Sequence, residues 1–223
     1  MSVATRRVRL EVESSAADQL MDELLLPYVQ IRDFMPQREL EELLEYVLSH
    51  PHKFKPATVG NTEQTFLNTN VRVALTWGNL GPLYEWLQGR FLDALPFIME
   101  KTGAPGPLPD SLEVGLAAHG DGAFYRPHVD LLTGHDGAKS PTSEAARVLS
   151  AVYYFHAEPK RFSGGELRLF RLGSESGFVD IEPLQNSLIA FHSWMRHEVR
   201  PVAVPSGEFR DYRFAVNCWY RRP

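Results

Sequence analysis

Three short motifs with a histidine and an acid two residues apart are the first sign of chemistry in the sequence. They are His119/Asp121, His128/Asp130 and His156/Glu158. Residues i and i+2 of a β-strand point to the same face, so such a pair at a strand end directs an imidazole and a carboxylate into one cavity. An imidazole and a carboxylate suit a divalent metal. Because three pairs share the spacing, their surroundings must decide between them.

The surroundings favour His128 and Asp130. This pair follows the β-prone segment 124–127 and precedes two leucines, which is typical of the edge of a strand. His119 is followed by two glycines within three residues, and His156 lies three residues before a proline, so we expect both in turns.

A third ligand is expected on a more distant strand, and His197 is the candidate. It opens an alternating segment that runs from residue 197 to residue 202. Two histidines and one carboxylate with open positions are the arrangement of non-haem Fe(II) oxygenases. An isolated histidine on a strand is usually structural, so His197 gains support only from the wider pattern of the sequence.

The elements that must position these ligands are short strands. From about residue 110 the sequence has a period of two and is rich in β-forming residues between turns. The predicted strands are Ser111–Ala117, Val148–Phe155, Glu166–Phe170, Ser187–Phe191 and Tyr212–Trp219. Such a series indicates a β-sandwich or jelly roll. Residues 131–146 form a long loop, of the kind that serves as a lid or a mobile segment.

The first hundred residues contain the helical patterns. Residues Gln37–Leu48 carry one apolar stripe and begin after Pro36, and a second helix is predicted over Leu83–Met99. Pro82 could occupy the first turn of this second helix, and Pro96 should bend it or start a new turn. Strands are expected at Tyr28–Phe34 and Val71–Leu75.

These patterns predict a mainly β fold with flanking helices, in which the N-terminal helices pack on one sheet. We expect a single domain over residues 1–223. Residues 1–108 would be a support region of helices and strands, and residues 109–223 would be the metal-binding core.

Composition excludes several classes of protein. The 223 residues are 43% hydrophobic, which is enough for a core. The net charge of -5 and the lack of a long basic run argue against nucleic-acid or anionic-membrane partners. A single cysteine, Cys218, cannot form an intramolecular disulfide, and no signal peptide or apolar run of about 20 residues is evident. We therefore expect a soluble, cytoplasmic protein.

Six segments in order carry a resemblance to a known family. They are Phe124–Asp130, Val152–Phe155, Ser163–Leu169, Val179–Pro183, His197–Val199 and Arg213–Tyr220. Together they resemble the prolyl-4-hydroxylase-like branch of the Fe(II)/2-oxoglutarate-dependent dioxygenases, which includes the hypoxia-inducible-factor prolyl hydroxylases and their bacterial relatives. The resemblance is close over about residues 110–220. It implies a double-stranded β-helix, or jelly roll, with the metal inside its open end.

The resemblance also implies roles for particular residues. The iron ligands would be His128, Asp130 and His197. The arginine that binds the distal carboxylate of 2-oxoglutarate would be Arg213, six residues before Trp219. An arginine suits this role because its planar fork pairs with a carboxylate through two hydrogen bonds. The resemblance gives Tyr154 a hydrogen bond to the same carboxylate and makes Leu167 an apolar wall of the pocket.

Several features depart from the family pattern. Residues 205–211 look inserted before the last strand, so Arg210 is a rival of Arg213 for the carboxylate. The loop after Asp130 is longer than in close relatives. Ala118 stands where some relatives have a tyrosine that contacts the cosubstrate, and Tyr125 is a candidate replacement. Residues 1–108 match only in general layout.

Other motifs have simpler interpretations. Ser163–Gly165 lacks the following helix of a phosphate cradle and is read as a hairpin turn. Asp180 and Glu182 are expected to face solvent rather than to act as paired catalytic acids. Substrate contact and simple packing remain equal alternatives for Trp194 and Arg196. Cys218 is expected to be buried.

The predicted activity is a hydroxylase that uses Fe(II), 2-oxoglutarate and O2, with ascorbate as an open addition. A prolyl residue in a protein or peptide is one substrate candidate, and a free amino acid or small metabolite is the other. A non-catalytic jelly-roll module that keeps a metal is the alternative from another class. A cupin-type metalloenzyme without 2-oxoglutarate would leave Arg213 and Tyr154 without a role. The sequence predicts no oligomeric state.

Overall fold

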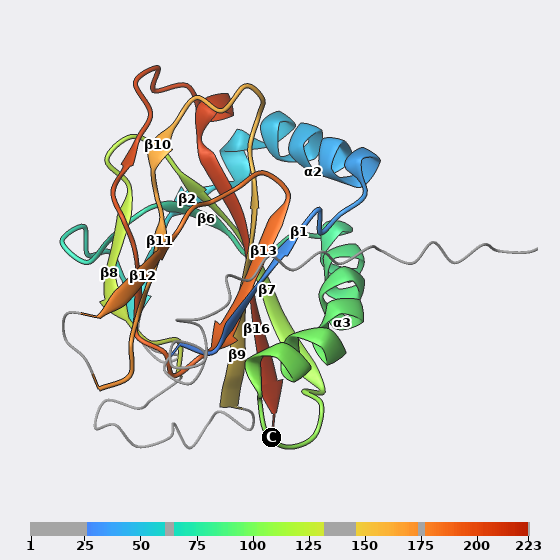
Figure 1. The fold of residues 1–223 in the computed structure, drawn as a ribbon. Coiled ribbons are helices and arrows are strands. Elements are labelled where there is room, and N and C mark those ends of the chain that lie inside the picture. The colour runs from blue at the N-terminus through green and yellow to red at the C-terminus, as the bar shows by residue number, and fades with distance from the viewer. Residues whose placement is uncertain (1–25, 61–64, 132–145, 174–176, 223) are drawn as a thin grey trace, which may run out of the picture.

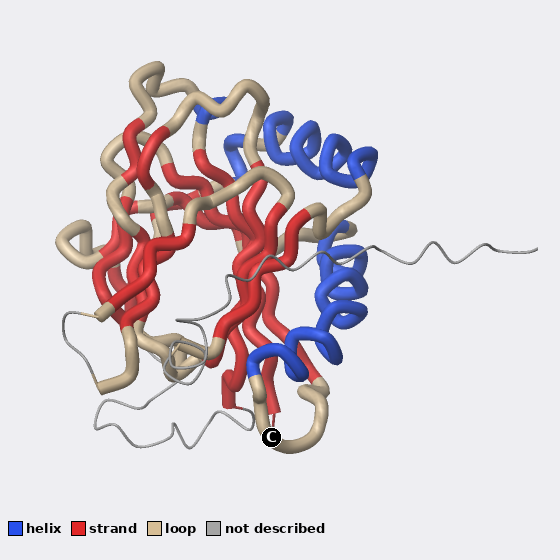
Figure 2. Tube along the Cα trace, in the orientation of Figure 1, coloured by secondary structure: helices blue, strands red, loops and turns tan. Residues whose placement is uncertain are grey.

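Two antiparallel sheets that face each other form the frame of the protein (Figure 1, Figure 2). The computed structural model describes residues 26–60, 65–131, 146–173 and 177–222. Most of the predicted loop 131–146 and the first 25 residues therefore lie outside the described residues. Every strand pair that the structure describes is antiparallel.

The larger sheet has seven strands. In spatial order they are β1 (Tyr28–Arg32), β13 (Ser187–His192), β9 (Ala146–Phe155), β16 (Arg213–Arg222), β7 (Ser111–His119), β6 (Leu75–Trp77) and β2 (Lys55–Pro56). Its central strands are buried along most of their length, because helices cover one face and the smaller sheet faces the other.

The smaller sheet has five strands and carries most of the side chains expected to do chemistry. In spatial order they are β12 (Phe178–Ile181), β11 (Leu167–Phe170), β14 (His197–Val199), β8 (Phe124–His128) and β5 (Arg72–Val73). Two small ribbons complete the strands: β10 (Ser163–Gly164) with β15 (Val202–Ala203), and β3 (Val59–Gly60) with β4 (Thr65–Phe66).

Two helices pack on the outer face of the larger sheet. Helix α2 (Gln37–Ser49) begins after Pro36 and buries Leu40, Leu43 and Val47, the stripe seen in the sequence. Helix α3 (Leu83–Thr102) continues through Pro96, and Figure 1 shows its axis bending, as predicted. It ends at Gly103, whose φ of 64° suits glycine at a helix C-terminus. Neither of these helices is long and apolar enough to cross a membrane.

The predicted fold class, mainly β with flanking helices, is confirmed. One predicted strand was wrong. Residues Val71–Leu75 do not form one strand: β5 joins the smaller sheet, and β6 joins the larger sheet after a break at Ala74. A run of alternating residues indicates extended chain but does not reveal that the chain leaves one sheet for the other.

Two apolar clusters hold these layers together. One lies between the helices and the larger sheet and includes Phe91, Leu43 and Tyr153. The other lies between the two sheets and includes Leu167, Phe191 and Ala215. The second cluster closes one side of the space in which the candidate ligands meet.

Candidate active site

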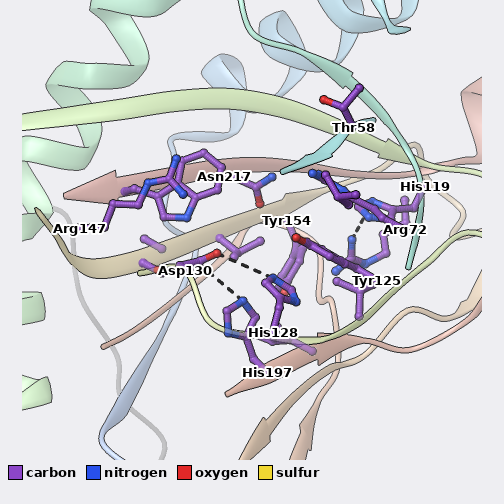
Figure 3. A pocket seen from close by; sticks show the side chains of 18 of the residues that line it. Thr58, Arg72, His119, Tyr125, His128, Asp130, Arg147, Tyr154, His197 and Asn217 are labelled. Atoms are coloured by element: carbon purple, nitrogen blue, oxygen red, sulfur yellow. Dashed lines mark hydrogen bonds and ion pairs between the residues drawn. The ribbon is translucent and has the colours of Figure 1, made fainter. Parts of the chain in front are cut away.

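A cavity of about 210 Å³ opens between the two sheets, and strands of both contribute to its wall. Every residue predicted to bind metal or cosubstrate lines it: His128, Asp130, His197, Arg213, Tyr154, Leu167 and Tyr125. Figure 3 shows His128, His197 and Asp130 meeting in the middle of the cavity. Arg147 lies toward one end of it, and His119 and Arg72 lie toward the other.

Three potential metal ligands converge in this cavity. His128 is the last residue of β8, Asp130 follows two residues later, and His197 is the first residue of β14. Asp130 lies between the imidazoles: its Oδ1 is 3.8 Å from Nε2 of His128 and its Oδ2 is 3.6 Å from Nε2 of His197. One ligand atom from each residue falls within 4.8 Å of the others, a spacing that could hold one metal ion.

Backbone contacts aim both imidazoles. Nδ1 of His128 lies 2.8 Å from the carbonyl oxygen of Arg126, and Nδ1 of His197 lies 2.9 Å from that of Met195. A carbonyl oxygen only accepts, so each Nδ1 carries a hydrogen, and Nε2 is the ring nitrogen that can bind a metal. This arrangement is typical of metal-binding histidines.

Asp130 is held by residues of the larger sheet and the loop after it. Ser150 Oγ donates to Asp130 Oδ2 at 2.6 Å, Trp219 adds a side-chain hydrogen bond, and the Asp130 backbone N–H donates to the Ser193 carbonyl at 2.9 Å. Burial would raise the pKa of Asp130, but His197, His128 and the side-chain hydrogen bonds from Ser150 and Trp219 lower it.

The protonation states suit metal binding. Burial, reinforced by His197, lowers the pKa of His128 to about 3. The site therefore presents a neutral imidazole at His128 and an ionised carboxylate at Asp130 at neutral pH, the forms that bind metals.

The other two His-x-acid pairs lie apart from this cluster. His156 has its Nδ1 3.0 Å from the Ala157 carbonyl and packs against Phe162. His119 was expected in a turn, which was wrong: it is the last residue of β7 and lines the cavity. Asp121, the acid of that pair, accepts the backbone N–H of Val204 instead. The glycines after His119 begin the turn only once its own strand has ended.

Arg213 forms a cationic corner of the cavity. It is 1% exposed, and its guanidinium lies 4.6 Å from the centre of the Tyr154 ring. Its Nη1 donates to His119 Nδ1 at 3.1 Å. By hydrogen-bond geometry, Arg213 Nε and Nη2 and the Tyr154 hydroxyl are buried without a partner among the described residues. The two side chains still interact, and each opposes the effect of burial on the pKa of the other.

These free groups fit a carboxylate. Burial lowers the pKa of Arg213, yet a guanidinium stays charged in proteins. Two free N–H groups on one edge of a cation match the two oxygens of a carboxylate, and a nearby hydroxyl can add a third hydrogen bond. Leu167, also buried, supplies an apolar wall. Arg210, the rival arginine, lies in an exposed 3-10 turn (Phe209–Asp211) outside the cavity wall.

Tyr125 and Arg72 stack in turn on the imidazole of His128. The Tyr125 ring stacks on His128 with centroids 3.5 Å apart, and the Arg72 guanidinium lies 4.7 Å from the Tyr125 ring centre. Burial raises the pKa of Tyr125 and lowers that of Arg72. Arg72 Nε is buried and has no hydrogen-bonding partner among the described residues.

Sequence reasoning missed several residues of this wall. Ser150 lies an even number of residues from Tyr154 on β9, and so do Asn217 and Trp219 from Arg213 on β16. Residues so spaced on a strand point to the same face, so the period of two could have identified these three wall residues. Arg72 comes from the poorly matched N-terminal region and gave no such signal.

The remaining motifs behave as structural features. The predicted hairpin turn at Ser163–Gly165 was wrong: Ser163 and Gly164 form β10, which pairs with β15, and Gly164 and Gly165 both have positive φ. Exposed Asp180 pairs with Arg168 at 2.7 Å and exposed Glu182 with Lys160 at 2.8 Å, and Cys218 is buried.

Trp194 and Arg196 do not line the cavity. Trp194 stacks on His192, and the Arg196 guanidinium lies 4.6 Å from the Phe170 ring centre. Both side chains are exposed, so contact with a substrate outside the cavity and simple packing stay equal alternatives for them.

Comparison with known proteins agrees with this geometry. Residues 114–221 match the 2OG-Fe(II) oxygenase superfamily. An uncharacterised PKHD-type hydroxylase of Synechocystis sp. is 29% identical over 225 residues, which cover 97% of this chain and 71% of the relative.

Two solved structures share the fold. A prolyl-4-hydroxylase from Pseudomonas putida is similar with a TM-score of 0.62 and 21% identity, covering 92% of this chain and 97% of that one. A prolyl hydroxylase from Trichoplax adhaerens, in complex with a peptide fragment of the hypoxia-inducible-factor oxygen degradation domain, also has a TM-score of 0.62. It is 19% identical and covers 93% of this chain and 94% of that one.

These findings confirm the predicted resemblance to the 2OG-Fe(II) oxygenases and the prediction of an oxidoreductase, and the chain shares its fold with two prolyl hydroxylases. Fe(II), 2-oxoglutarate and O2 are the cofactors and cosubstrates that the family implies.

Proposed function

We propose that this chain is a 2OG-Fe(II) oxygenase that hydroxylates a prolyl residue of a peptide or protein at an iron held by His128, Asp130 and His197. One observation carries the proposal. The three converging ligands and the free edge of Arg213 share a single cavity, so a metal and a dicarboxylate can bind side by side. The likeness of the fold to two prolyl hydroxylases, one bound to a peptide, supports the choice of substrate.

The residues fit the groups they would hold. Two neutral imidazoles and a carboxylate are the ligand set that Fe(II) oxygenases use, and the triad leaves positions open. Two N–H groups of the buried Arg213, Nε and Nη2, and the Tyr154 hydroxyl lack hydrogen-bonding partners among the described residues, as a distal carboxylate requires.

The chain's own residues bind and orient, while the iron and cosubstrate supply the oxidation. That chemistry converts 2-oxoglutarate and O2 to succinate and CO2 and places one oxygen atom in a substrate C–H bond. Leu167 and the apolar cluster between the sheets keep water from one side of the cavity. Ser150 and Trp219 hold the carboxylate of Asp130 in place.

A second candidate substrate is a free amino acid or another small carboxylate, and Arg72 favours it. This arginine lines the same cavity, and its Nε has no partner. Of the other arginines that line the cavity, Arg147 pairs with Glu113, whereas Arg72 forms no ion pair among the described residues, although the charge of Asp130 acts on it. A substrate carboxylate would satisfy it.

Succinate release in the presence of Fe(II) and 2-oxoglutarate tests both candidates. The substrates to compare are prolyl peptides blocked at both ends and free L-proline. Stimulation by the blocked peptides, lost in His128→Ala, supports the prolyl-peptide activity. Stimulation by L-proline alone, weakened in Arg72→Gln, supports the small carboxylate. No stimulation by any prolyl compound would contradict the proposed substrate.

A further inference from the structure

His119 is hydrogen-bonded to Arg213 in the cavity, and the proposed function gives this histidine no role. The two residues are register partners across the antiparallel pair β7 and β16, one at the end of its strand and the other at the start. They are 4% and 1% exposed, and 3.1 Å separates His119 Nδ1 from Arg213 Nη1. Strand pairing therefore keeps this histidine beside the arginine.

Chemistry determines the direction of this hydrogen bond. A guanidinium has five N–H donors and no acceptor, so His119 Nδ1 must accept. The imidazole is then neutral and carries its hydrogen on Nε2. Burial, together with the positive charges of Arg213 and Arg72, holds the pKa of His119 well below its usual value and keeps the ring in this form.

Two other residues restrain Arg213. Gly165 has a φ of 74°, and a Cβ at this position would lie 2.7 Å from Arg213 Cδ and 3.1 Å from its Nε. The Tyr154 ring covers the guanidinium from another side. The arginine stem thus lies against a bare backbone, with no room to shift in that direction.

We propose that His119 is a positioning residue that holds the guanidinium of Arg213 by Nη1, so that its Nε and Nη2 edge faces the distal carboxylate of 2-oxoglutarate. This inference rests on the proposed role of Arg213. The hydrogen bonding of the guanidinium supports this role. Nη1 is bonded to His119, and by hydrogen-bond geometry Nε and Nη2 are buried without a partner among the described residues.

A neutral acceptor suits this position better than an acid. An aspartate or glutamate beside Arg213 would also orient the guanidinium, but its negative charge would oppose a dicarboxylate in a buried site. A neutral imidazole accepts the hydrogen bond and leaves the full positive charge for the cosubstrate. A positioning role therefore explains why this chain has a histidine where a salt bridge would weaken binding.

Matched variants separate positioning from simple packing. His119→Leu removes the acceptor, whereas His119→Asn places an amide oxygen near the position of Nδ1. Dissociation constants are measured by calorimetry on the anaerobic Fe(II) protein, with 2-oxoglutarate and with pyruvate as probes. Pyruvate has the keto acid end but no distal carboxylate, so it reports on the iron end alone.

We expect His119→Leu to weaken 2-oxoglutarate binding about 10- to 100-fold, as loss of a hydrogen bond to a charged group does. Pyruvate binding should change less than about twofold, and His119→Asn should recover 2-oxoglutarate binding to within about threefold. In turnover, the His119→Leu defect should lie in KM for 2-oxoglutarate, with kcat restored at saturation.

Other outcomes overturn the inference or the function separately. Unchanged 2-oxoglutarate binding in His119→Leu, or an equal loss for pyruvate, contradicts the positioning role. Unchanged 2-oxoglutarate binding in Arg213→Ala contradicts the proposed role of Arg213 itself. Should His119→Leu fail to fold, ¹⁵N NMR of histidine-labelled wild-type protein still decides, because a hydrogen on Nδ1 of His119 excludes the proposed hydrogen bond.

Discussion

His128 and His197 are register partners across the antiparallel strands β8 and β14, with ring centroids 4.2 Å apart. The pairing of two short strands thus brings together two candidate ligands from distant parts of the chain. Asp130 completes the cluster from just beyond the end of β8. The site therefore depends on the smaller sheet as much as on the ligands themselves.

Replacing His197 by alanine should remove one of three metal ligands. We expect Fe(II) affinity to fall more than about 100-fold, beyond the 10- to 100-fold that loss of an outer-shell partner costs, and 2-oxoglutarate turnover to be lost. Metal content after dialysis and succinate release measure the two effects. The matched control is His156→Ala, which removes the histidine of a pair that lies apart from the cluster. Iron retained by His197→Ala at wild-type levels would exclude this ligand set.

Ser150→Ala should loosen Asp130 without removing a ligand. The hydroxyl donates to Asp130 Oδ2 at 2.6 Å, and partners of this kind typically contribute about 10-fold or more to metal affinity. We expect weaker Fe(II) binding with recovery of turnover at high iron concentration. Ser163→Ala, in the exposed β10 ribbon, is the control. Equal iron affinity in both variants would show that the hydrogen bond from Ser150 to Asp130 does not contribute to metal binding.

Arg213→Lys tests whether 2-oxoglutarate binding needs the two parallel N–H groups of the guanidinium or only its positive charge. Lysine keeps the positive charge but cannot present two parallel N–H groups, so KM for 2-oxoglutarate should rise about 10-fold or more. Arg210→Ala should leave KM unchanged, because Arg210 lies outside the cavity wall. A rise in KM for Arg210→Ala and none for Arg213→Lys would reverse the assignment.

Local patterns predicted the elements and most of the site. The apolar stripe of Gln37–Leu48 became α2, and the alternation in Val148–Phe155 became all of β9 but its first two residues. These predictions succeeded because a buried stripe or face imposes its period on the sequence. The distances among the three ligands could not be predicted in this way, since strand register is a long-range property.

The misses have the same physical origin. His119 was set aside because glycines follow it, yet its role depends on Arg213, which only the pairing of β7 with β16 brings near. Arg72 enters the cavity from β5, where the chain changes sheets. A single strand's period does not report contacts of this kind.

Asn186→Ala should destabilise the fold strongly. The buried Asn186 amide accepts from the Met35 N–H and the Tyr153 hydroxyl and donates to the Met35 carbonyl, tying the start of α2 to the larger sheet. Its φ of 55° also disfavours alanine. Unpaired buried groups cost about 1–3 kcal/mol each, so we expect a loss of about 2–5 kcal/mol in the free energy of unfolding.

Urea denaturation of Asn186→Ala and Asn68→Ala measures this effect. Asn68 makes an exposed local hydrogen bond to the Asn70 N–H, and its loss should change stability by less than about 0.5 kcal/mol. Similar losses in the two variants would mean that Asn186 does not join α2 to the sheet.

The metal-free protein should lose stability as the pH falls from 7 toward 5. Burial is the first cause of a lowered pKa at His119, His128 and His156, so each stays neutral in the folded state at a pH where it takes up a proton when unfolded. The unfolded state then binds more protons below a pH of about 6.5, and stability falls with pH. Each such histidine contributes up to about 1.4 kcal/mol per pH unit.

His119→Asn isolates one part of this dependence, because asparagine keeps the acceptor for Arg213 but does not titrate. Urea unfolding with a chelator at pH 7, 6 and 5 should give a shallower slope for the variant, by up to about one proton. The sign follows from the direction of the pKa shift: the contribution of His119 is complete above its unfolded pKa and is lost as the pH falls. Parallel curves for the two proteins would mean that His119 takes up a proton equally in both states, which its burial beside two arginines argues against.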